Sequence, residues 1–394
     1  MQRVDSVDVL RALALIGMVI CHFPIYLSNG AGNDAMLYFF TNHLLGGDFG
    51  ASWFVFLVGM SQVLSAKKRE ANLVKDVSNF SRTIIRGAAI FITGLLFLFV
   101  VEGYEELWVW DILTFIGAMT IILLICRSVP SRWLLLFCVT VFFITPWLRS
   151  FIDIASFYGG KFESVKWISD IIPNFIFDPA IDYKGGKTVL DNVIGFFLIG
   201  QFPLFPWIIF PLTGFVLGRR MTANLLAADS PFILIIGMMF TFMGLFTAYA
   251  GSIRTGFSVP NDYIVPLSFY PISFSMIMLV MGVVLILFIS IWRIYDAYPD
   301  SAKAPGFFLI YSRQISKYSL TIYITHFALF FIPLRIVKSI TGTYYMKNLI
   351  STPAALTLAV VVLMLYYPLL KQWDKAGGKY SFEWLLAKLL SRYK

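Results

Sequence analysis

Charged side chains are scarce in this sequence of 394 residues. Only 13% of the residues are charged and 59% are hydrophobic, whereas an ordinary soluble domain has about 25% charged residues. With a mean hydropathy of +0.79, too few polar side chains remain to cover a surface that faces water. This composition excludes a soluble enzyme, and we predict an all-α integral membrane protein.

Histidine and cysteine are also rare, with three of each. Cys21, Cys126 and Cys138 lie in or beside apolar runs and form no CxxC pair, so neither a disulfide framework nor a structural zinc site is indicated. No Walker loop, GxSxG, HExxH or Rossmann glycine pattern occurs, so ATP-driven transport and zinc hydrolysis lack support. We expect no metal. We also expect no nucleic-acid partner, because the net charge of +9 falls in short segments between apolar runs.

Ten apolar runs are long enough to cross a hydrocarbon core about 30 Å thick. The predicted spans are residues 8–28, 50–66, 84–101, 108–126, 132–148, 200–218, 231–250, 269–292, 317–336 and 353–370. If the N-terminus is cytoplasmic, the inner segments hold 22 of the Lys and Arg residues and the outer segments hold 9, as the positive-inside rule expects. We therefore predict one domain, residues 1–394, with about ten transmembrane helices and both termini cytoplasmic.

The longest segment between two predicted spans is residues 149–199. It is too polar to cross the bilayer and long enough to form a loop or cap over the outer face. Gln201, Pro203, Pro206 and Trp207 follow it directly and predict a broken or re-entrant helix at the start of the sixth span.

The first predicted span carries three ionisable groups, which are costly in a bilayer and are often functional. Arg11 and His22 are eleven residues apart, so they share one helix face to within about 20° and lie about 16 Å apart along the axis. Asp8 stands three residues before Arg11 and is close enough to pair with it. One face thus carries a cation toward the inner side and an imidazole toward the outer side. The alternative is a snorkelling Arg11 and a His22 that is hydrogen-bonded within the bundle.

The other two histidines are further candidates for acid–base chemistry. His43 stands near Asp48 at the outer mouth of the bundle, where a carboxylate could orient it as a base, although a solvated loop histidine fits equally. His326 lies in the ninth predicted span, seven residues after Ser319, with Tyr323 on the neighbouring stripe. A polar stripe of this kind serves packing as often as catalysis, so both interpretations stay open.

Further polar groups lie at the ends of the predicted spans. Asp111 stands near the outer end of the fourth span among aromatic residues, as an interfacial group or as part of a site. Arg82 and Arg86 are one helical turn apart at the cytoplasmic start of the third span, where they could clamp phosphates or act as simple anchors. Arg219 and Arg220 lie at the cytoplasmic end of the sixth span.

The opening helix resembles that of the transmembrane acyltransferase superfamily. The likeness rests on Ser6-Val-Asp-Val-Leu-Arg-Ala-Leu-Ala and on the ten residues that separate Arg11 from His22, as in acyltransferase family 3. Other features are similar to the branch related to heparan-alpha-glucosaminide N-acetyltransferase, in which a catalytic histidine precedes the second-helix motif much as His43 does here. These features are Trp53-Phe-Val-Phe-Leu-Val-Gly-Met-Ser, Asp111-Ile-Leu with Gly117, Phe205-Pro-Trp with Gly214 and Gly218-Arg, and Tyr318-Ser-Leu-Thr-Ile-Tyr-Ile-Thr-His.

The resemblance implies transfer of an acyl group, usually acetyl, from cytoplasmic acyl-CoA to a hydroxyl or amine of a glycan or other acceptor at the outer face. It further implies a multi-pass protein of the bacterial inner membrane. The side chains that would hold the CoA phosphates are Arg11, Arg82, Arg86, Arg219 and Arg220. The candidates for catalysis are His22, His43, Asp48 and His326, and those for acceptor binding are Asp111, Trp207 and Tyr323. The base would deprotonate the acceptor or take the acyl group itself.

A transporter or flippase for a small molecule or lipid-linked glycan is the main alternative, because it would also combine ten spans, a broken helix and intramembrane charges. That class needs coupling-ion carboxylates near mid-membrane, whereas most Asp and Glu residues here lie in loops or at span ends. A non-catalytic scaffold or sensor is the third alternative. The expected partners are the lipid bilayer, acyl-CoA and an acceptor at the outer face, and a homo-oligomer stays open.

Overall fold

The computed structural model describes residues 3–28, 35–41, 47–71, 76–101, 107, 109–152, 189–252, 267–268, 271–297, 305–342 and 349–391. Every regular element within these ranges is a helix, which confirms the all-α prediction. The helices are α1 (Asp5–Leu27), α2 (Ala35–Phe40), α3 (Gly47–Ala71), α4 (Asp76–Val101), α5 (Ile112–Ile125), α6 (Ser131–Arg149), α9 (Val189–Ile194), α10 (Leu204–Trp207), α11 (Ile209–Thr222), α12 (Leu226–Ser252), α13 (Phe274–Trp292), α14 (Phe307–Lys317), α15 (Ser319–Thr341), α16 (Thr352–Lys375) and α17 (Phe382–Ser391).

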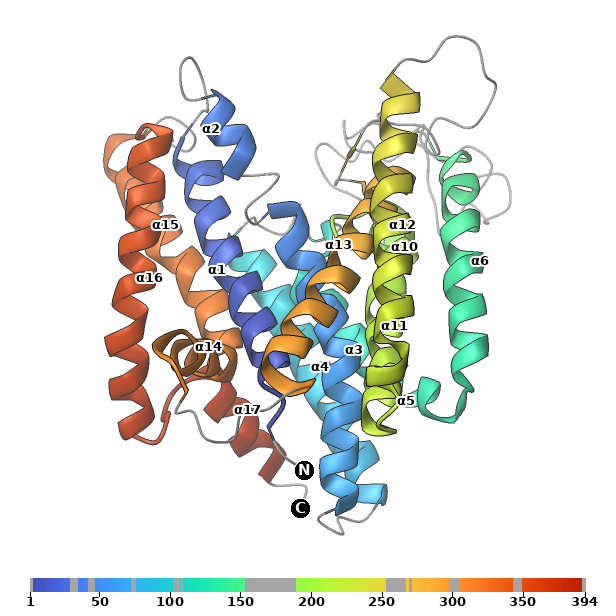
Figure 1. Cartoon of the computed structure of the whole chain (residues 1–394). Helices are drawn as coiled ribbons and strands as arrows, with labels where there is room; N and C mark the ends of the chain where they lie inside the picture. The colour runs from blue at the N-terminus through green and yellow to red at the C-terminus, as the bar shows by residue number, and fades with distance from the viewer. Residues whose placement is uncertain are drawn as a thin grey trace.

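Nine helical segments in the described part of the chain are long and apolar enough to span a membrane. The remaining predicted span, the fourth (108–126), corresponds to a shorter apolar helix, Ile112–Ser128, made of α5 and a 3-10 turn. The start of α1 and the helix α17 lie at the same end of the bundle (Figure 1). The cytoplasmic location of both ends stays a prediction.

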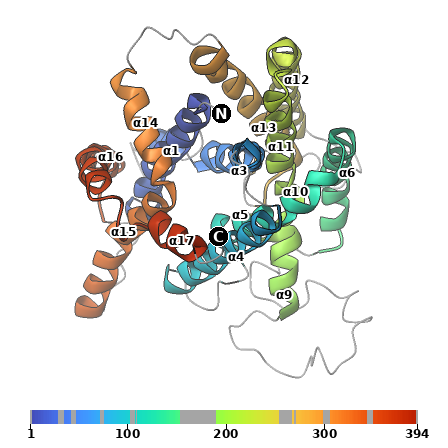
Figure 2. The ribbon, with the colours of Figure 1, turned by 90° about the horizontal axis from the view of Figure 1, so that it is seen from below.

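The bundle has an inner core and a lipid-facing periphery. Seen along the bundle, α1 and α3 lie near the middle, α15 and α16 at one edge and α6 at the opposite edge (Figure 2). Peripheral α12 exposes large apolar side chains, among them Phe232, Met238 and Phe242. A soluble protein rarely exposes so continuous an apolar surface, whereas a lipid environment favours it.

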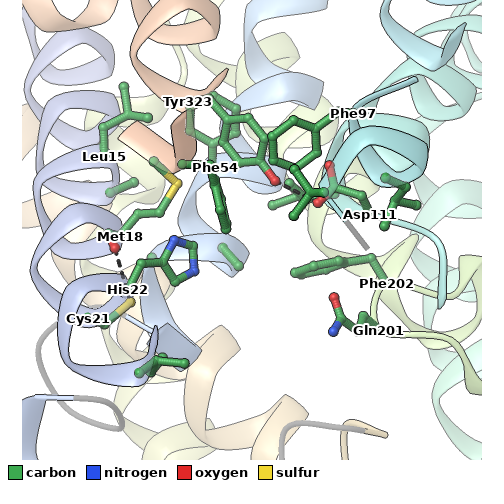
Figure 3. Close-up of a pocket in the computed structure, with 18 of the residues that line it drawn as sticks. Leu15, Met18, Cys21, His22, Phe54, Phe97, Asp111, Gln201, Phe202 and Tyr323 are labelled. Atoms are coloured by element: carbon green, nitrogen blue, oxygen red, sulfur yellow. Dashed lines mark hydrogen bonds between the residues drawn. The ribbon is translucent and has the colours of Figure 1, made fainter. Parts of the chain in front are cut away.

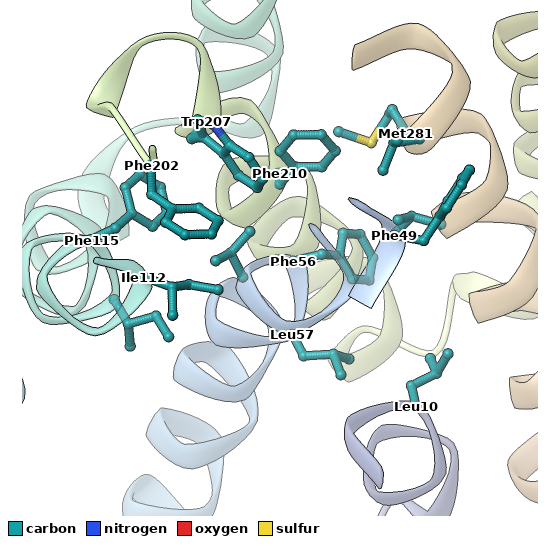
Figure 4. Packing of buried hydrophobic residues seen from close by; sticks show 14 of the residues in the cluster. Leu10, Phe49, Phe56, Leu57, Ile112, Phe115, Phe202, Trp207, Phe210 and Met281 are labelled. Carbon is teal, nitrogen blue, oxygen red and sulfur yellow. The ribbon is translucent and has the colours of Figure 1, made fainter. Parts of the chain in front are cut away.

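The core between the central helices is aromatic and closely packed. Phe56 of α3, Phe115 of α5 and Phe210 of α11 are buried there, together with Met281 of α13 (Figure 4). Helices α3 and α11 touch backbone to backbone: a Cβ atom added to Gly59 would lie 1.8 Å from the carbonyl oxygen of Pro211. Small residues at helix contacts permit this approach in membranes, and it holds α3 firmly in place.

The predicted break in the sixth span is confirmed. A helical segment ends with the π-turn Gly195–Ile199, residues 200–203 are non-helical, and the helix resumes as α10 and α11. The freed backbone is satisfied within the protein, since the N–H of Gln201 donates to the carbonyl of Val109 at 2.7 Å. Most of the predicted outer cap, residues 153–188 of 149–199, lies outside the described residues.

Candidate active site

Two cavities lie end to end between α1, α3, α4, α5 and α15. The first, of about 310 Å³, is at the end of the bundle where α3 begins, and we call it the outer cavity. The second, of about 400 Å³, is at the end where α1 begins, and we call it the inner cavity. Phe54 and Tyr323 line both cavities, so the two spaces meet at these side chains.

His22 and His326 form a hydrogen-bonded pair at the wall of the outer cavity. Nδ1 of His22 lies 2.9 Å from Nε2 of His326, and the two rings are nearly parallel, with an interplanar angle of 10°. His22 lines the cavity, and Figure 3 shows its imidazole pointing from α1 into the space. His326 is fully buried behind it, with 0% of its surface exposed. The structure thus brings together two of the three histidines predicted from the sequence.

The partner of His326 fixes the tautomers of the neutral pair. Nδ1 of His326 lies 3.1 Å from the carbonyl oxygen of Ile322, and a carbonyl can only accept, so this nitrogen carries the hydrogen. Nε2 of His326 is then an acceptor and receives the Nδ1–H of His22. The other ring nitrogen of His22, Nε2, keeps its lone pair. This arrangement suits a general base in the outer cavity.

Asp111 and Tyr323 form a second pair between distant helices. The hydroxyl of Tyr323 donates to Oδ1 of Asp111 at 2.6 Å, and the N–H of Leu113 donates to Oδ2 at 3.0 Å, which caps the start of α5. Asp111 is 7% exposed and lines the outer cavity across from His22 (Figure 3). Asp111 is therefore a buried residue of the cavity wall and not an exposed group at the membrane interface.

Arg11 lines the inner cavity and links three helices. Its guanidinium donates to the hydroxyl of Ser316 on α14 at 2.8 Å and to that of Ser61 on α3 at 2.7 Å. The predicted pairing of Asp8 with Arg11 is indirect: Asp8 forms its ion pair with Arg3 and accepts the hydroxyl of Ser316. Arg11 is thus held directly by neutral hydroxyls, and the carboxylate of Asp8 lies behind one of them.

Three more ionisable groups line the inner cavity. Arg86 of α4 faces this space and is solvent-exposed. Lys317 forms an ion pair with Asp374, and this contact raises the pKa of Lys317 above its usual value. Glu383 of α17 accepts the first backbone N–H groups of α15 at 2.7 and 3.0 Å. The inner cavity therefore combines three cations with one carboxylate, whereas the lining of the outer cavity is mostly apolar.

The other arginines predicted for the site lie elsewhere. Arg219 donates to the backbone carbonyls of residues 126, 127 and 129 at the end of the α5 segment, at 2.7 to 3.0 Å. Arg220 pairs with Asp229. Neither residue lines the inner or the outer cavity, and Arg82 is absent from both linings as well. Arg219 and Arg220 were predicted to join Arg11 because all three lie near the same membrane face, but they do not line the cavity that Arg11 lines.

Trp207 also lines neither of the two cavities. It is 0% exposed and packs among the rings of Phe115, Phe202 and Phe210 in the aromatic core. The predicted contact between Trp207 and an acceptor therefore has no support in the cavity walls. Phe202, which packs on this tryptophan, lines the outer cavity.

Two predicted catalytic residues fall where the structure gives no placement. His43 and the side chain of Asp48 lie outside the described residues. Sequence reasoning also missed several residues of the walls. Ser61 is the last residue of the motif that begins at Trp53, and Ser316 stands two residues before the motif that begins at Tyr318. A polar side chain at the edge of each motif could have indicated these two wall residues. Phe54 also belongs to the second-helix motif, but its apolar side chain gave no sign of a cavity wall.

The fold and the paired cavities define an integral membrane protein whose polar groups are enclosed within a helical bundle. A family model described as "Heparan-alpha-glucosaminide N-acetyltransferase, catalytic" matches residues 3–247, which is more than half of the chain. The chain therefore belongs to this family of membrane acetyltransferase catalytic domains. No curated protein matched the chain in a direct comparison. The matched residues include Arg11, His22 and Asp111 and end before α13, so His326 and Tyr323 lie beyond them.

Proposed function

We propose that this protein transfers an acetyl group from acetyl-CoA in the inner cavity to an amine or hydroxyl of a carbohydrate acceptor in the outer cavity. The observation that carries the proposal is the pair of cavities that meet at Phe54 and Tyr323, one cationic and one lined by an imidazole. Such a pair lets a donor and an acceptor approach from opposite sides of a membrane. A bacterial inner membrane is the location that fits a cytoplasmic donor.

The donor binds through charge at the inner cavity. CoA is an anion that cannot cross lipid, so its phosphates stay near Arg11, Arg86 and Lys317, which line this cavity. The pantetheine arm then extends along the bundle toward Tyr323. Arg11 and His22 are about 16 Å apart along α1, a distance that the arm bridges without the phosphates leaving the inner end.

The acceptor binds in the outer cavity, where His22 acts as the general base. Nε2 of His22 takes a proton from the acceptor nitrogen or oxygen, which attacks the thioester carbonyl carbon. The carbon–sulfur bond breaks, the CoA thiolate leaves, and the proton on His22 passes to that sulfur. His326 holds His22 in the required tautomer, and Asp111, fixed by Tyr323, accepts a hydrogen bond from the acceptor.

The first test is calorimetric binding of acetyl-CoA to the full chain purified in detergent, followed by transfer to glucosamine as the acceptor probe. Arg11→Ala should raise the Kd for acetyl-CoA about tenfold or more, because it removes a phosphate ligand. Arg11→Lys, which keeps the charge, should raise it less. His22→Ala should keep the affinity and lower kcat by a factor of about 10² to 10⁴.

Arg293→Ala is the matched control, since Arg293 lies at the same end of the bundle, donates to Ser230 and lines neither cavity. It should leave the Kd unchanged. A folded, monodisperse protein that binds no acetyl-CoA would refute the proposal and favour transport. Full activity of His22→Ala would refute the role of His22 alone.

A further inference from the structure

The wall between the two cavities includes one side chain from each of two helices. Phe54 comes from α3 and Tyr323 from α15, and among the residues that the structure describes only these two are common to both linings. His22 lines the outer cavity alone, and Arg11 lines the inner one alone. The two cavities therefore adjoin at Phe54 and Tyr323.

The two sides of this wall differ in how firmly they are held. The hydroxyl of Tyr323 is bonded to Asp111 at 2.6 Å. Its ring also packs on Phe97, His326 and Phe327, with centroids 5.6 to 6.1 Å apart. Phe54 is only half-buried, and its apolar ring can make no conventional hydrogen bond. Tyr323 is thus the fixed side of the wall, and Phe54 is the side whose size can be changed without breaking a polar contact.

Phe54 also stands where the reacting carbon must lie under the proposed function. The donor arm comes from the inner cavity, and the base, His22, acts in the outer cavity. The thioester carbonyl must reach the acceptor atom that His22 deprotonates, so it lies at the junction. The acyl chain beyond that carbonyl then shares about 310 Å³ with the acceptor, beside the ring of Phe54.

We infer that Phe54 is a specificity-determining residue whose ring, set against the fixed Tyr323, limits the length of the acyl chain that the protein transfers. This inference rests on the proposed function. A smaller side chain at position 54 joins the two cavities and makes room for additional methylene groups. A larger one narrows the junction.

The experiment compares Phe54→Trp, Phe54→Leu and Phe54→Ala with the unchanged protein, using acetyl-, propionyl- and butyryl-CoA as donors and glucosamine as the acceptor. The ratio of kcat/KM for butyryl-CoA to that for acetyl-CoA should rise at least about tenfold in Phe54→Ala and by less in Phe54→Leu. In Phe54→Trp the propionyl-to-acetyl ratio should fall. Calorimetric Kd values for the three donors give a readout that does not depend on turnover.

Phe142→Ala is the matched control. Phe142 is a half-buried phenylalanine of α6 whose ring lies 4.1 Å from that of Phe274, and it lines neither cavity. Phe142→Ala removes the same atoms as Phe54→Ala and should leave the butyryl-to-acetyl ratio of kcat/KM unchanged.

The outcomes separate this inference from the function on which it rests. If the unchanged protein binds and transfers acetyl groups while the ratios in Phe54→Leu and Phe54→Ala stay within about twofold of its own, Phe54 does not set chain length and only this inference is overturned. If the unchanged protein neither binds acetyl-CoA nor transfers it, both are overturned. If Phe54→Ala fails to fold, Phe54→Leu decides.

Discussion

The part of the chain that the family model covers and the part that follows it contribute differently to the site. Residues 3–247 supply four of the ionisable groups that face the cavities, namely Arg11, His22, Arg86 and Asp111, and the later part adds Lys317 and Glu383. The later helices α14 and α15 supply partners that orient them. His326 bonds to His22, Tyr323 to Asp111 and Ser316 to Arg11.

This difference explains why the family match over residues 3–247 does not include every residue of the candidate site. A histidine or carboxylate at the cavity wall has several possible orientations, and its partner selects one. The partners here are 212 to 305 residues away in the sequence. We therefore predict that substitutions in α14 and α15 lower activity because they release His22, Asp111 or Arg11 from its present orientation.

The largest effect expected from the later helices is that of His326→Ala. It removes the acceptor of the His22 Nδ1–H, so His22 loses its fixed tautomer, and kcat should fall about a hundredfold while KM for acetyl-CoA changes little. His326→Gln offers an amide oxygen as acceptor, so its kcat should be about tenfold higher than that of His326→Ala. Steady-state kinetics and the pH profile of kcat with glucosamine measure both.

A double variant tells whether His326 acts through His22. His22→Ala with His326→Ala should be no slower than His22→Ala alone, because the positioning residue has nothing left to orient. A further loss in the double variant would show an independent role for His326 and would break the proposed division between the two parts of the chain.

A smaller effect is expected from Tyr323→Phe, which keeps the ring and removes the hydroxyl that donates to Asp111. The free energy of unfolding should fall by about 2 kcal/mol, because a buried carboxylate loses a charge-assisted hydrogen bond. Denaturant unfolding in detergent measures this change. Tyr311→Phe is the control: its hydroxyl donates to the neutral carbonyl of Leu363, so its loss should be about 1 kcal/mol. An equal or larger loss in Tyr311→Phe would contradict the stronger hydrogen bond expected at Asp111.

The smallest effect is expected from Arg220→Ala. The sequence placed Arg220 with Arg11 at the inner face, whereas the structure pairs it with Asp229 away from both cavities. KM for acetyl-CoA should therefore stay within about twofold of the original value, since exposed ion pairs contribute little. An increase as large as that in Arg11→Ala would mean that the phosphates bind outside the inner cavity.

The sequence predicted elements much better than it predicted the site. Each of the ten predicted spans corresponds to a helix of the structure, because twenty apolar residues in a row have few alternatives in a bilayer. The break near Pro203 was also predictable, since proline removes a backbone donor. The site was harder: Arg219 and Trp207 were predicted for it on position and residue type, and each is instead held by contacts that no local pattern reveals.

The sequence by itself determined that this protein is a membrane helical bundle and that Arg11 and His22 share one face of α1. Both conclusions depend on local properties, namely hydropathy and the 3.6-residue period of a helix. Only the tertiary structure decided that His326 stands behind His22 and that Phe54 meets Tyr323 between two cavities. These contacts join helices far apart in the chain, and they depend on how the helices pack, which no helical period encodes.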